Sequence, residues 1–331
     1  MKLVERIEAM VQLGRYLDEN NSDWKDVKLK AFQNNAWFTS DFVDLATNNI
    51  TKNFLEKNKL QEWVNHYFLD DNIIPVNVGI VMAGNIPMVG FHDMLCVFIS
   101  GHKQTIRMSS KDNVLLKHIV EFLMQKFPEI TGYITFADML KGCDAYIATG
   151  ATNTARYFQQ YFGKYPNIIR SNRTSVAVLT GTETEKELEL LADDIHTYFG
   201  LGCRNVTKLY FPINYDFLPL LTACKKYAYM QDHPKYKNNY DYYLALQIMN
   251  NRYYMTNGNV ILTEDEQPFS AISTLHYSYY KDRTELMQEI SSNNNIQCII
   301  GSGSTGFGQA QIPALDTYAD GVDTLQFLLA L

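Results

Sequence analysis

The chain has 331 residues, of which 46% are apolar and 20% are charged. This composition is typical of a globular protein that can bury a large core, and the length suggests two domains. The formal net charge of −7 argues against a general polyanion-binding surface, so nucleic acid is not an expected partner.

The sequence shows no sign of targeting to a membrane. Lys2, Glu5, Arg6 and Glu8 interrupt any apolar run at the N-terminus that could act as a secretory signal. The most apolar region, residues 76–100, contains polar and charged residues that would be costly in hydrocarbon. We therefore expect no membrane span and a cytoplasmic location.

The cysteines form no CxxC pair and no cluster with histidine at metal-ligand spacing. They are Cys96, Cys143, Cys203, Cys224 and Cys298. We expect a reduced protein without a metal site. Because a buried cysteine usually acts only as a small hydrophobe, each must be judged by its surroundings.

The first half of the sequence alternates between strand and helix patterns, after an amphipathic helix expected over residues 4–17. Strands are expected over residues 77–83, 104–108, 133–136 and 145–148. Helices are expected from about Pro87, over residues 112–127 and over residues 152–161. This alternation predicts a parallel α/β sheet, in which ligands bind at the carboxyl ends of the strands.

A second set of elements follows, with a strand over residues 175–179 and a helix over about 185–198. Cys203 then lies in a glycine-containing turn before another strand. Residues 227–254 are rich in tyrosine, a pattern more typical of a helix face with solvated loops than of a ligand site, although such side chains can also line an acyl channel.

Cys203 is the first candidate for chemistry. Gly200 and Gly202 flank it, and such a turn can expose a thiol and aim backbone N–H groups at a reacting oxygen. An ordinary thiol is largely protonated at neutral pH, so activation by nearby amides or by Arg204 would matter. Local sequence alone still favours a cysteine that is simply lodged in a turn.

Three other features permit a functional interpretation. Asn85 follows a strand and could donate its amide N–H to an oxyanion, but it could also be an ordinary turn residue. Thr149 and Gly150 precede a helix whose N-terminal N–H groups could meet a phosphate, a weak signal alone. The histidines titrate near neutral pH, but a catalytic role is not favoured for any of them. Those considered are His92, His102 and His276.

Four short segments, in order and at matching spacing, resemble motifs of the aldehyde dehydrogenase superfamily. The segment AGNIP at residues 83–87 resembles the strand-end motif with its oxyanion asparagine, and residues 101–110 resemble the dinucleotide-binding strand and turn. Residues 144–152 resemble the segment that lies along the dinucleotide, and GLGC at residues 200–203 resembles the catalytic cysteine loop. The resemblance runs from about Asn77 to the C-terminus.

Within the superfamily, the sequence is most similar to the acyl-CoA reductase branch, which includes the reductase subunit of the bacterial bioluminescence fatty acid reductase. The stretches that carry this similarity are AGNIPMVGFHDML, SSKDNVLLKHIVEFL and YFGLGCRNVTKLYFP. The resemblance implies an α/β, aldehyde-dehydrogenase-like fold. Residues 1–172 would form an N-terminal helical region and a Rossmann-type dinucleotide-binding domain, residues 173–300 a second α/β catalytic domain, and residues 301–331 a segment that packs back on the body.

The resemblance also implies roles for individual residues. Cys203 would be the nucleophile and Asn85 an oxyanion donor. NADPH would be the cofactor. Its contacts would come from Arg107, Ser109, Ser110 and Lys111 at the adenosine ribose, and from Thr149 and Gly150 along the dinucleotide.

Two departures from the family pattern are informative. The glutamate that serves as base for thioester hydrolysis should fall near residues 169–173, where the sequence has no carboxylate. Oxidation to a free acid is therefore disfavoured. The glutamate that contacts the nicotinamide ribose has only an imperfect counterpart in the segment EDEQPF at residues 264–269, and we assign Glu266 to this role.

The expected function is the NADPH-dependent reduction of a long-chain acyl-CoA or acyl-carrier-protein thioester to the aldehyde, through an acyl-cysteine. One alternative is an acyltransferase or thioesterase that needs no cofactor, and another is a degenerate nucleotide-binding scaffold. The chain is shorter than a typical aldehyde dehydrogenase, which puts the family's oligomerisation elements in doubt. A homo-oligomer or a partner acyl-transfer enzyme remains an open expectation.

Overall fold

The structure is a computed structural model that describes residues 1–301 and 305–331. The chain divides into two compact units. The first consists of Met1–Asn172 and Pro313–Leu331, and the second of Arg173–Ile312. The polypeptide therefore leaves the first unit once and returns to it. No helix in the described residues is long and apolar enough to cross a membrane.

Four helices open the first unit: α1 (Leu3–Glu19), α2 (Ser22–Asn34), α3 (Ser40–Phe54) and α4 (Lys57–His66). The expected amphipathic helix is confirmed in α1, where Ile7, Met10, Leu13 and Leu17 are all buried. Asn21 caps α2 by accepting the backbone N–H of Trp24 at 3.0 Å. Helices α2 to α4 were not assigned from the sequence.

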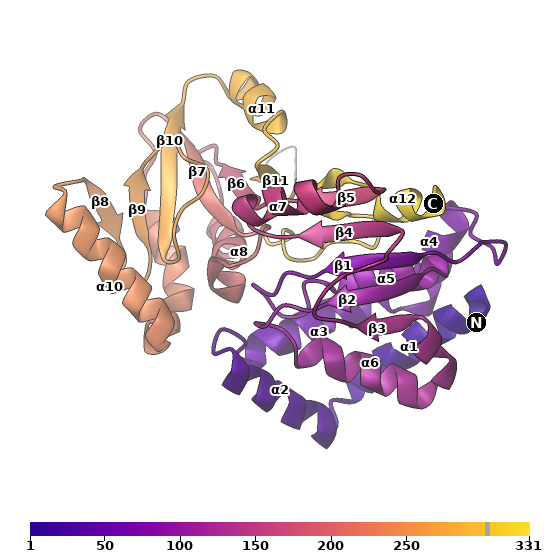
Figure 1. Cartoon of the computed structure of the whole chain (residues 1–331). Helices are drawn as coiled ribbons and strands as arrows, with labels where there is room; N and C mark the ends of the chain where they lie inside the picture. The colour runs from indigo at the N-terminus through magenta and orange to yellow at the C-terminus, as the bar shows by residue number, and fades with distance from the viewer. Residues whose placement is uncertain (302–304) are drawn as a thin grey trace. The chain divides into compact units, whose positions relative to one another are not determined.

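A five-stranded parallel sheet forms the centre of the first unit, in the order β3-β2-β1-β4-β5 (Figure 1). Its strands are β1 (Asn77–Val81), β2 (Lys103–Arg107), β3 (Ile134–Phe136), β4 (Ala145–Thr149) and β5 (Asn167–Arg170). The helical connections are α5 (Phe91–Ser100), α6 (Leu115–Lys126), the 3₁₀ turn η1 (Pro128–Gly132) and α7 (Thr152–Phe162). The predicted parallel α/β arrangement is confirmed.

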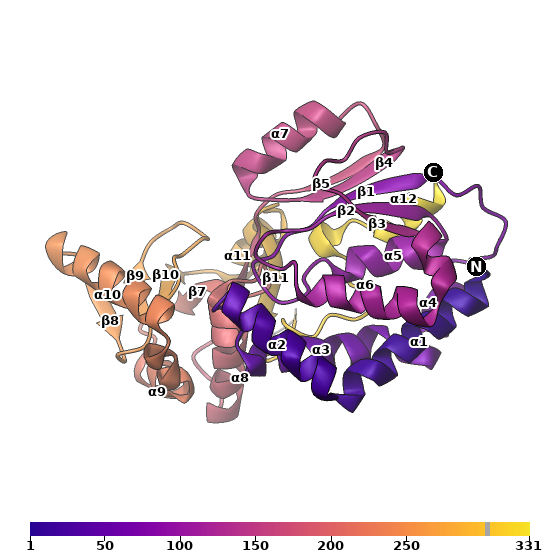
Figure 2. The same ribbon diagram turned by 60° about the horizontal axis from the view of Figure 1, so that its bottom comes forward.

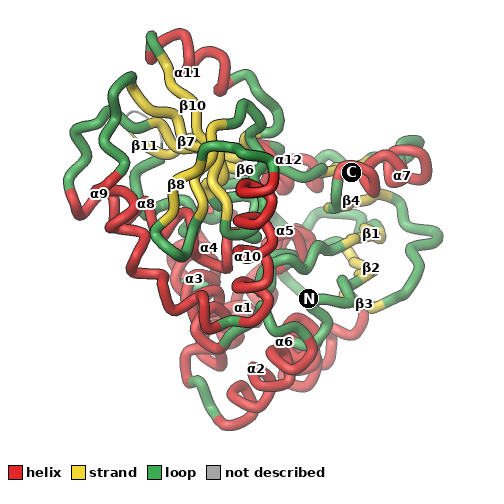
Figure 3. The backbone as a smooth tube through the Cα atoms, turned by 90° about the vertical axis from the view of Figure 1, so that its left-hand side faces the viewer, coloured by secondary structure: helices red, strands yellow, loops and turns green. Residues whose placement is uncertain are grey.

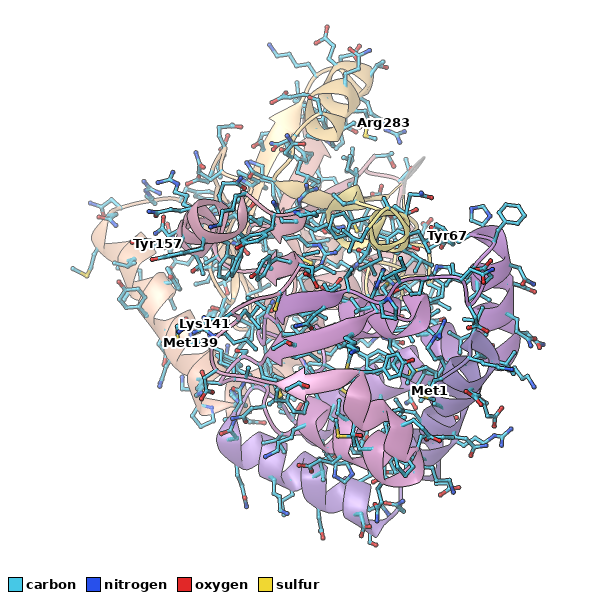
Figure 4. All side chains as sticks on the ribbon, turned by 45° about the vertical axis from the view of Figure 1, so that its right-hand side comes forward. Met1, Tyr67, Met139, Lys141, Tyr157 and Arg283 are labelled. Atoms are coloured by element: carbon cyan, nitrogen blue, oxygen red, sulfur yellow. The ribbon has the colours of Figure 1, made fainter. Side chains whose placement is uncertain are left out.

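The helices cover both faces of this sheet. Helix α7 lies on one face, and α5 and α6 lie on the other (Figure 2). The connections between the parallel strands are right-handed. From β1 the chain runs outward to β2 and β3, and from β4 it runs the other way to β5, so the helices fall on opposite faces and the strand order reverses between β1 and β4. Residues 137–144, which join β3 to β4, contain no helix, and their Met139 and Lys141 are exposed (Figure 4). Ligands of such sheets bind at the carboxyl edge beside the reversal.

Two helices begin later than the sequence indicates. The helix expected from Pro87 begins at Phe91, because Met88 adopts a left-handed conformation with a φ of 55°. The helix expected from residue 112 begins at Leu115. Asp112 instead turns its buried carboxylate towards the backbone N–H of Met88, at 2.7 Å.

The second unit contains a six-stranded sheet in the order β11-β6-β7-β10-β9-β8. Its strands are β6 (Thr174–Val178), β7 (Val206–Pro212), β8 (Tyr254–Thr256), β9 (Ile261–Glu264), β10 (Thr274–Tyr280) and β11 (Ile296–Gly301). Only the edge strand β8 pairs in the antiparallel sense. In Figure 3 the strands of this sheet, drawn in yellow, lie side by side. Every residue of β6 is buried, as expected for a strand of a covered parallel sheet.

Helices surround the second sheet, and one of them ends directly before the turn that carries Cys203. They are α8 (Glu185–His196), the 3₁₀ turn η2 (Thr197–Gly200), α9 (Leu218–Ala223), the 3₁₀ turn η3 (Cys224–Asp232), α10 (Pro234–Met249) and α11 (Arg283–Ser291). Thr184 and Glu187 form a reciprocal capping box at the start of α8. Most of the tyrosine-rich stretch belongs to η3 and α10.

The C-terminal segment belongs to the first unit and contains the 3₁₀ turn η4 (Ala319–Gly321) and α12 (Thr324–Leu329). Helix α12 lies beside α5 (Figure 2). The imidazoles of His92 and His102 hydrogen-bond to the carbonyl oxygens of Leu315 and Leu328, at 2.8 and 2.9 Å. Both histidines therefore anchor this segment.

Candidate functional site

The residues assigned to cofactor and oxyanion in the first unit gather at the carboxyl edge of its sheet. Arg107 is the last residue of β2 and Thr149 the last of β4. Asn85 follows β1, which lies between these two strands. Val81 is in register with Arg107 on one side and with Ala148 on the other, so the three strand ends are level. This edge is the ligand-binding edge of a doubly wound sheet.

The turn that bears Asn85 packs directly on the turn after β2. A Cβ atom at Gly84 would lie 2.6 Å from both side-chain atoms of Ser109, so only glycine permits this contact. Asp112 joins the same two turns by accepting the N–H of Met88. Burial raises the pKa of the Asp112 carboxyl from 3.8 to about 7, although the Met88 N–H opposes this rise. The turn that bears the half-buried Asn85 is therefore held against the turn after β2 through Gly84 and Asp112.

The backbone of the segment Ser109–Lys111 is hydrogen-bonded to residues at the end of α2, and some of its side chains are exposed to solvent. Asn34 at the end of α2 donates to the Ser110 carbonyl at 3.2 Å, and Asn35 donates to the Lys111 carbonyl at 3.2 Å. Ser110, Lys111 and the Arg107 side chain are exposed. Two cations and two hydroxyl groups thus occur within five residues at the end of β2.

Thr149 and Gly150 lead from β4 into α7. The backbone N–H of Gly150 donates to the Arg170 carbonyl at 3.2 Å. A Cβ at Gly150 would meet Phe158 at 3.0 Å and Thr154 at 3.1 Å, so the close approach of α7 itself requires this glycine. Helix α7 begins without a side-chain cap, which leaves its first N–H groups without the usual side-chain acceptor. Tyr157, further along the helix, points away from the sheet and is 62% exposed (Figure 4).

Residues 169–173, near which the resemblance would place the hydrolytic glutamate, include a buried cation. Arg170, the last residue of β5, is 3% exposed. Its guanidinium lies 2.6 Å from the Asp93 carboxylate and donates to the Thr324 hydroxyl at 2.9 Å. Burial disfavours the charged guanidinium, but the Asp93 carboxylate outweighs this effect and the pKa of Arg170 lies above its ordinary value. Arg170 is therefore a permanently charged structural residue.

In the second unit, Cys203 lies in a tightly shaped turn between α8 and β7. Tyr198, Phe199 and Gly200 have φ values of 55°, 57° and 73°, so three successive residues are left-handed. Such a run is unfavourable for residues with a Cβ and persists only where the surroundings enforce it. The turn reverses the chain sharply just before the cysteine.

Cys203 differs from the other cysteines in exposure. It is half-buried, whereas Cys96, Cys143, Cys224 and Cys298 are buried, and none of the five forms a disulfide. Burial raises the pKa of the Cys96 and Cys143 thiols and raises that of Cys224 to about 12. These three thiols are therefore poor nucleophiles. The guanidinium of Arg204 donates a hydrogen bond to the Cys298 sulfur at 3.2 Å.

Buried polar groups that the sequence interpretation did not single out surround the turn. Asn205 has no exposed surface and donates to carbonyl oxygens at the end of α8. Ser175, at the start of β6, donates its hydroxyl to the Cys203 carbonyl at 3.0 Å. No local signal in the sequence connects Ser175 to Cys203, because the contact is made across the sheet.

Glu266 lies in the exposed turn that follows β9. Its carboxylate accepts the Ser278 hydroxyl at 3.2 Å. The ammonium group of Lys208, a buried residue of β7, donates to Ser278 Oγ and to the Asp265 carbonyl. Burial lowers the pKa of Lys208, and the neighbouring carboxylates, led by Glu266, oppose this. Lys208 thus ties the turn bearing Glu266 to the strand that follows Cys203, a link that the sequence interpretation missed.

His276 contacts the turn that bears Glu266. His276 hydrogen-bonds through Nδ1 to the Gln267 carbonyl at 2.8 Å and so supports the same turn. Among residues 1–301 and 305–331, no group of three or more His, Cys, Asp or Glu side chains is arranged to hold a metal ion. The predicted site residues thus fall into two sets, one in each unit: Cys203 and Glu266 in the second, and the others in the first.

Comparison with known proteins gives structural matches only. No protein-family model and no curated protein matches the sequence. An indole-3-acetaldehyde dehydrogenase in complex with NAD⁺ matches with a TM-score of 0.67 at 11% identity, covering 90% of this chain and 71% of that one. KauB, an aldehyde dehydrogenase from Pseudomonas aeruginosa, matches with a TM-score of 0.68 at 13% identity, covering 91% and 72%.

A third structure leads to the same conclusion. A putative aldehyde dehydrogenase from Burkholderia cenocepacia matches with a TM-score of 0.68 at 10% identity, covering 92% of this chain and 76% of that one. At such low identity the likeness concerns the fold. The chain has the fold of the aldehyde dehydrogenases, so the fold class expected from the sequence is confirmed.

Proposed function

We propose that this protein reduces a fatty acyl thioester to the aldehyde, with NADPH as reductant and Cys203 as the nucleophile. The observation that carries the proposal is the position of Cys203. It is the one half-buried cysteine among the five, and it lies in a strained turn between a helix and a strand of a chain with the aldehyde dehydrogenase fold. The motifs around Asn85 and Cys203 support the reductase branch of that superfamily.

The first unit offers a surface that suits a dinucleotide. The carboxyl edge beside the strand reversal carries the exposed Arg107 and Lys111, and Ser110 lies between them in sequence. The uncapped start of α7, which Thr149 and Gly150 precede, suits a phosphate group. When bound, NADPH supplies the hydride for the reduction.

The chain's own groups would perform the acyl transfer. The Cys203 thiolate attacks the thioester carbonyl, and the electron pair of the C=O bond moves onto oxygen. In the proposed mechanism the Asn85 amide and the Cys203 backbone N–H stabilise this oxyanion. The tetrahedral species collapses by breaking the bond to the departing thiolate, which takes up a proton, and the acyl group remains on Cys203.

The acyl-cysteine should be resistant to water. Hydrolysis needs a general base beside the thioester, and residues 169–173 offer none, since Arg170 is a buried cation paired with Asp93. An acyl-enzyme that survives until it is reduced suits a reductase. This feature disfavours a thioesterase.

The test uses the purified protein, a long-chain acyl-CoA and either NADPH or no cofactor. With NADPH we expect loss of absorbance at 340 nm matched by aldehyde, and without it a stable acyl adduct on Cys203 seen by mass spectrometry. Cys203→Ala should abolish both, whereas Cys224→Ala, a buried cysteine of the same unit, should retain both. An adduct on another cysteine, with none on Cys203, would contradict the assignment.

A further inference from the structure

We propose that Asn205 and Ser175 are positioning residues, which hold the peptide groups around Cys203 in the orientation that acyl transfer requires. The proposal rests on the proposed function only in taking Cys203 as the nucleophile. Neither residue is assigned a chemical role by the reaction described above. Both are completely buried, so neither is positioned to meet a substrate itself.

Asn205 joins the turn to the end of α8. Its amide nitrogen donates to the carbonyl oxygens of Asp194 at 3.0 Å, Ile195 at 3.3 Å and Thr197 at 2.8 Å. These carbonyls lack intrahelical partners because the helix ends there. The amide oxygen of Asn205 accepts the Gly202 N–H at 2.7 Å. One buried side chain therefore both closes the helix and anchors the residue before Cys203.

The backbone of Asn205 completes the closure. Its N–H donates to the Gly202 carbonyl at 3.1 Å, so Gly202 and Asn205 are joined by two reciprocal hydrogen bonds that enclose Cys203 and Arg204. The peptide group between Gly202 and Cys203 is trans, since no cis peptide bond occurs in the described part of the chain. In such a group the N–H points opposite to the C=O. Drawing the Gly202 carbonyl towards Asn205 thus sets the direction of the Cys203 N–H.

Ser175 holds the peptide group on the other side of Cys203. Its hydroxyl donates to the Cys203 carbonyl at 3.0 Å and accepts the Cys298 N–H at 3.1 Å. Its backbone N–H donates to the Asn205 carbonyl at 3.1 Å. The start of β6 is therefore bonded to both ends of the Cys203–Asn205 segment. Rotation of either peptide group would break bonds to buried partners, which is costly.

The need for these anchors follows from the strain before the turn. Tyr198 and Phe199 are left-handed despite their Cβ atoms, so the segment would relax if it were released. Relaxation would turn the Cys203 N–H away from the position where charge develops on the thioester oxygen. It would change the intrinsic reactivity of the Cys203 thiol much less, because the thiol would remain in a partly exposed turn. Loss of the anchors should therefore damage acyl transfer more than thiol chemistry in general.

The experiment compares two reactions of the same thiol in the full chain. Acylation by p-nitrophenyl acetate develops an oxyanion, whereas alkylation by iodoacetamide does not, and mass spectrometry assigns each product to Cys203. We expect Asn205→Ala to slow acylation by about 10²-fold and Ser175→Ala by about tenfold, as for a misplaced reacting group. Both variants should alkylate within about threefold of the wild type across pH 6–10, with an unchanged pH midpoint.

The matched control is Asn257→Ala. Asn257 also organises a turn of the second unit, by donating to Leu221 and accepting the N–H groups of Asn259 and Val260. It should lower stability without changing the ratio of acylation to alkylation. If Asn205→Ala does not fold, Ser175→Ala decides alone, because it removes only one hydroxyl.

Equal loss of both reactions, or loss of neither, in folded variants would overturn the proposal. Failure of the proposed function would be recognised separately. In that case the wild type would acylate with p-nitrophenyl acetate at Cys203 but show neither acylation nor reduction with acyl-CoA. The comparison of variants would still be valid.

Discussion

The buried carboxylate of Asp112 should make the stability of the first unit depend on pH. The residue is 2% exposed, and its Oδ1 has no hydrogen-bond partner in the described structure. The pKa of about 7 in the folded chain, against 3.8 ordinarily, means that the fold prefers the protonated carboxyl. This contribution to stability is fully present below the unfolded pKa of about 4 and is lost as the pH rises through about 7.

The size of the effect follows from the difference between the two pKa values. A tenfold difference in proton affinity is worth about 1.4 kcal/mol, so about three powers of ten correspond to roughly 4 kcal/mol. Asp112→Asn keeps the shape of the side chain and an acceptor for the Met88 N–H, but it cannot ionise. Between pH 4 and pH 8 we expect the unfolding free energy of the variant to gain roughly 4 kcal/mol relative to the wild type.

Tryptophan fluorescence provides a suitable assay. Trp24, Trp37 and Trp63 are the only tryptophans and all belong to the first unit, so urea unfolding followed at this signal reports the unit that contains Asp112. Asp144→Asn is the matched control, because Asp144 also accepts a backbone N–H, that of Asn77, but is exposed. A wild-type-to-variant difference that stays constant across this pH range within about 1 kcal/mol would refute the reasoning.

Three further predictions concern the proposed reaction. Asn85→Ala should lower the single-turnover rate of Cys203 acylation by about 10²–10³-fold, the usual effect of deleting one oxyanion donor. A near-normal rate would show that Asn85 is only a turn residue. Ser110→Glu should weaken NADPH binding at least about tenfold relative to NADH, by repulsion of the 2′-phosphate; equal effects in titrations with both cofactors would argue against that contact. With a long-chain aldehyde and NADP⁺, acyl-CoA should form when CoA is supplied, and only slow formation of free acid is expected without CoA; rapid acid release without CoA would reveal another base.

The first sheet could be predicted well because its signals are local. Residues 77–81 form a largely apolar run, as expected for a parallel strand that is buried on both faces. Turn-forming residues follow this run and end the strand. The start of α5 was misplaced because Met88, left-handed and bonded to Asp112, delays the helix until Phe91. Helices α2 to α4 were missed although the signal was present in α3, where Phe42, Ala46, Ile50 and Phe54 form a buried stripe at helical spacing.

The candidate site could be predicted only in part. The glycines around Cys203 and the turn after β1 indicate candidate reactive positions from short segments. The residues that shape them, Ser175, Asn205 and Asp112, act through contacts between distant parts of the chain, and their types are common in any loop. The reductase branch, the preference for NADPH and the individual site roles stay predictions, because the structural matches establish the fold alone.

The discontinuous first unit has a consequence for biosynthesis. All residues of the second unit have been made once Ile312 is added, whereas the first unit still lacks α12 at that moment. Helix α12 buries Leu325 and Leu328 beside α5, which is apolar along most of its length, and it supplies the Thr324 hydroxyl to the buried Arg170. A nascent chain on the ribosome therefore carries an uncovered α5 surface until its last helix emerges, although most of that unit was translated first.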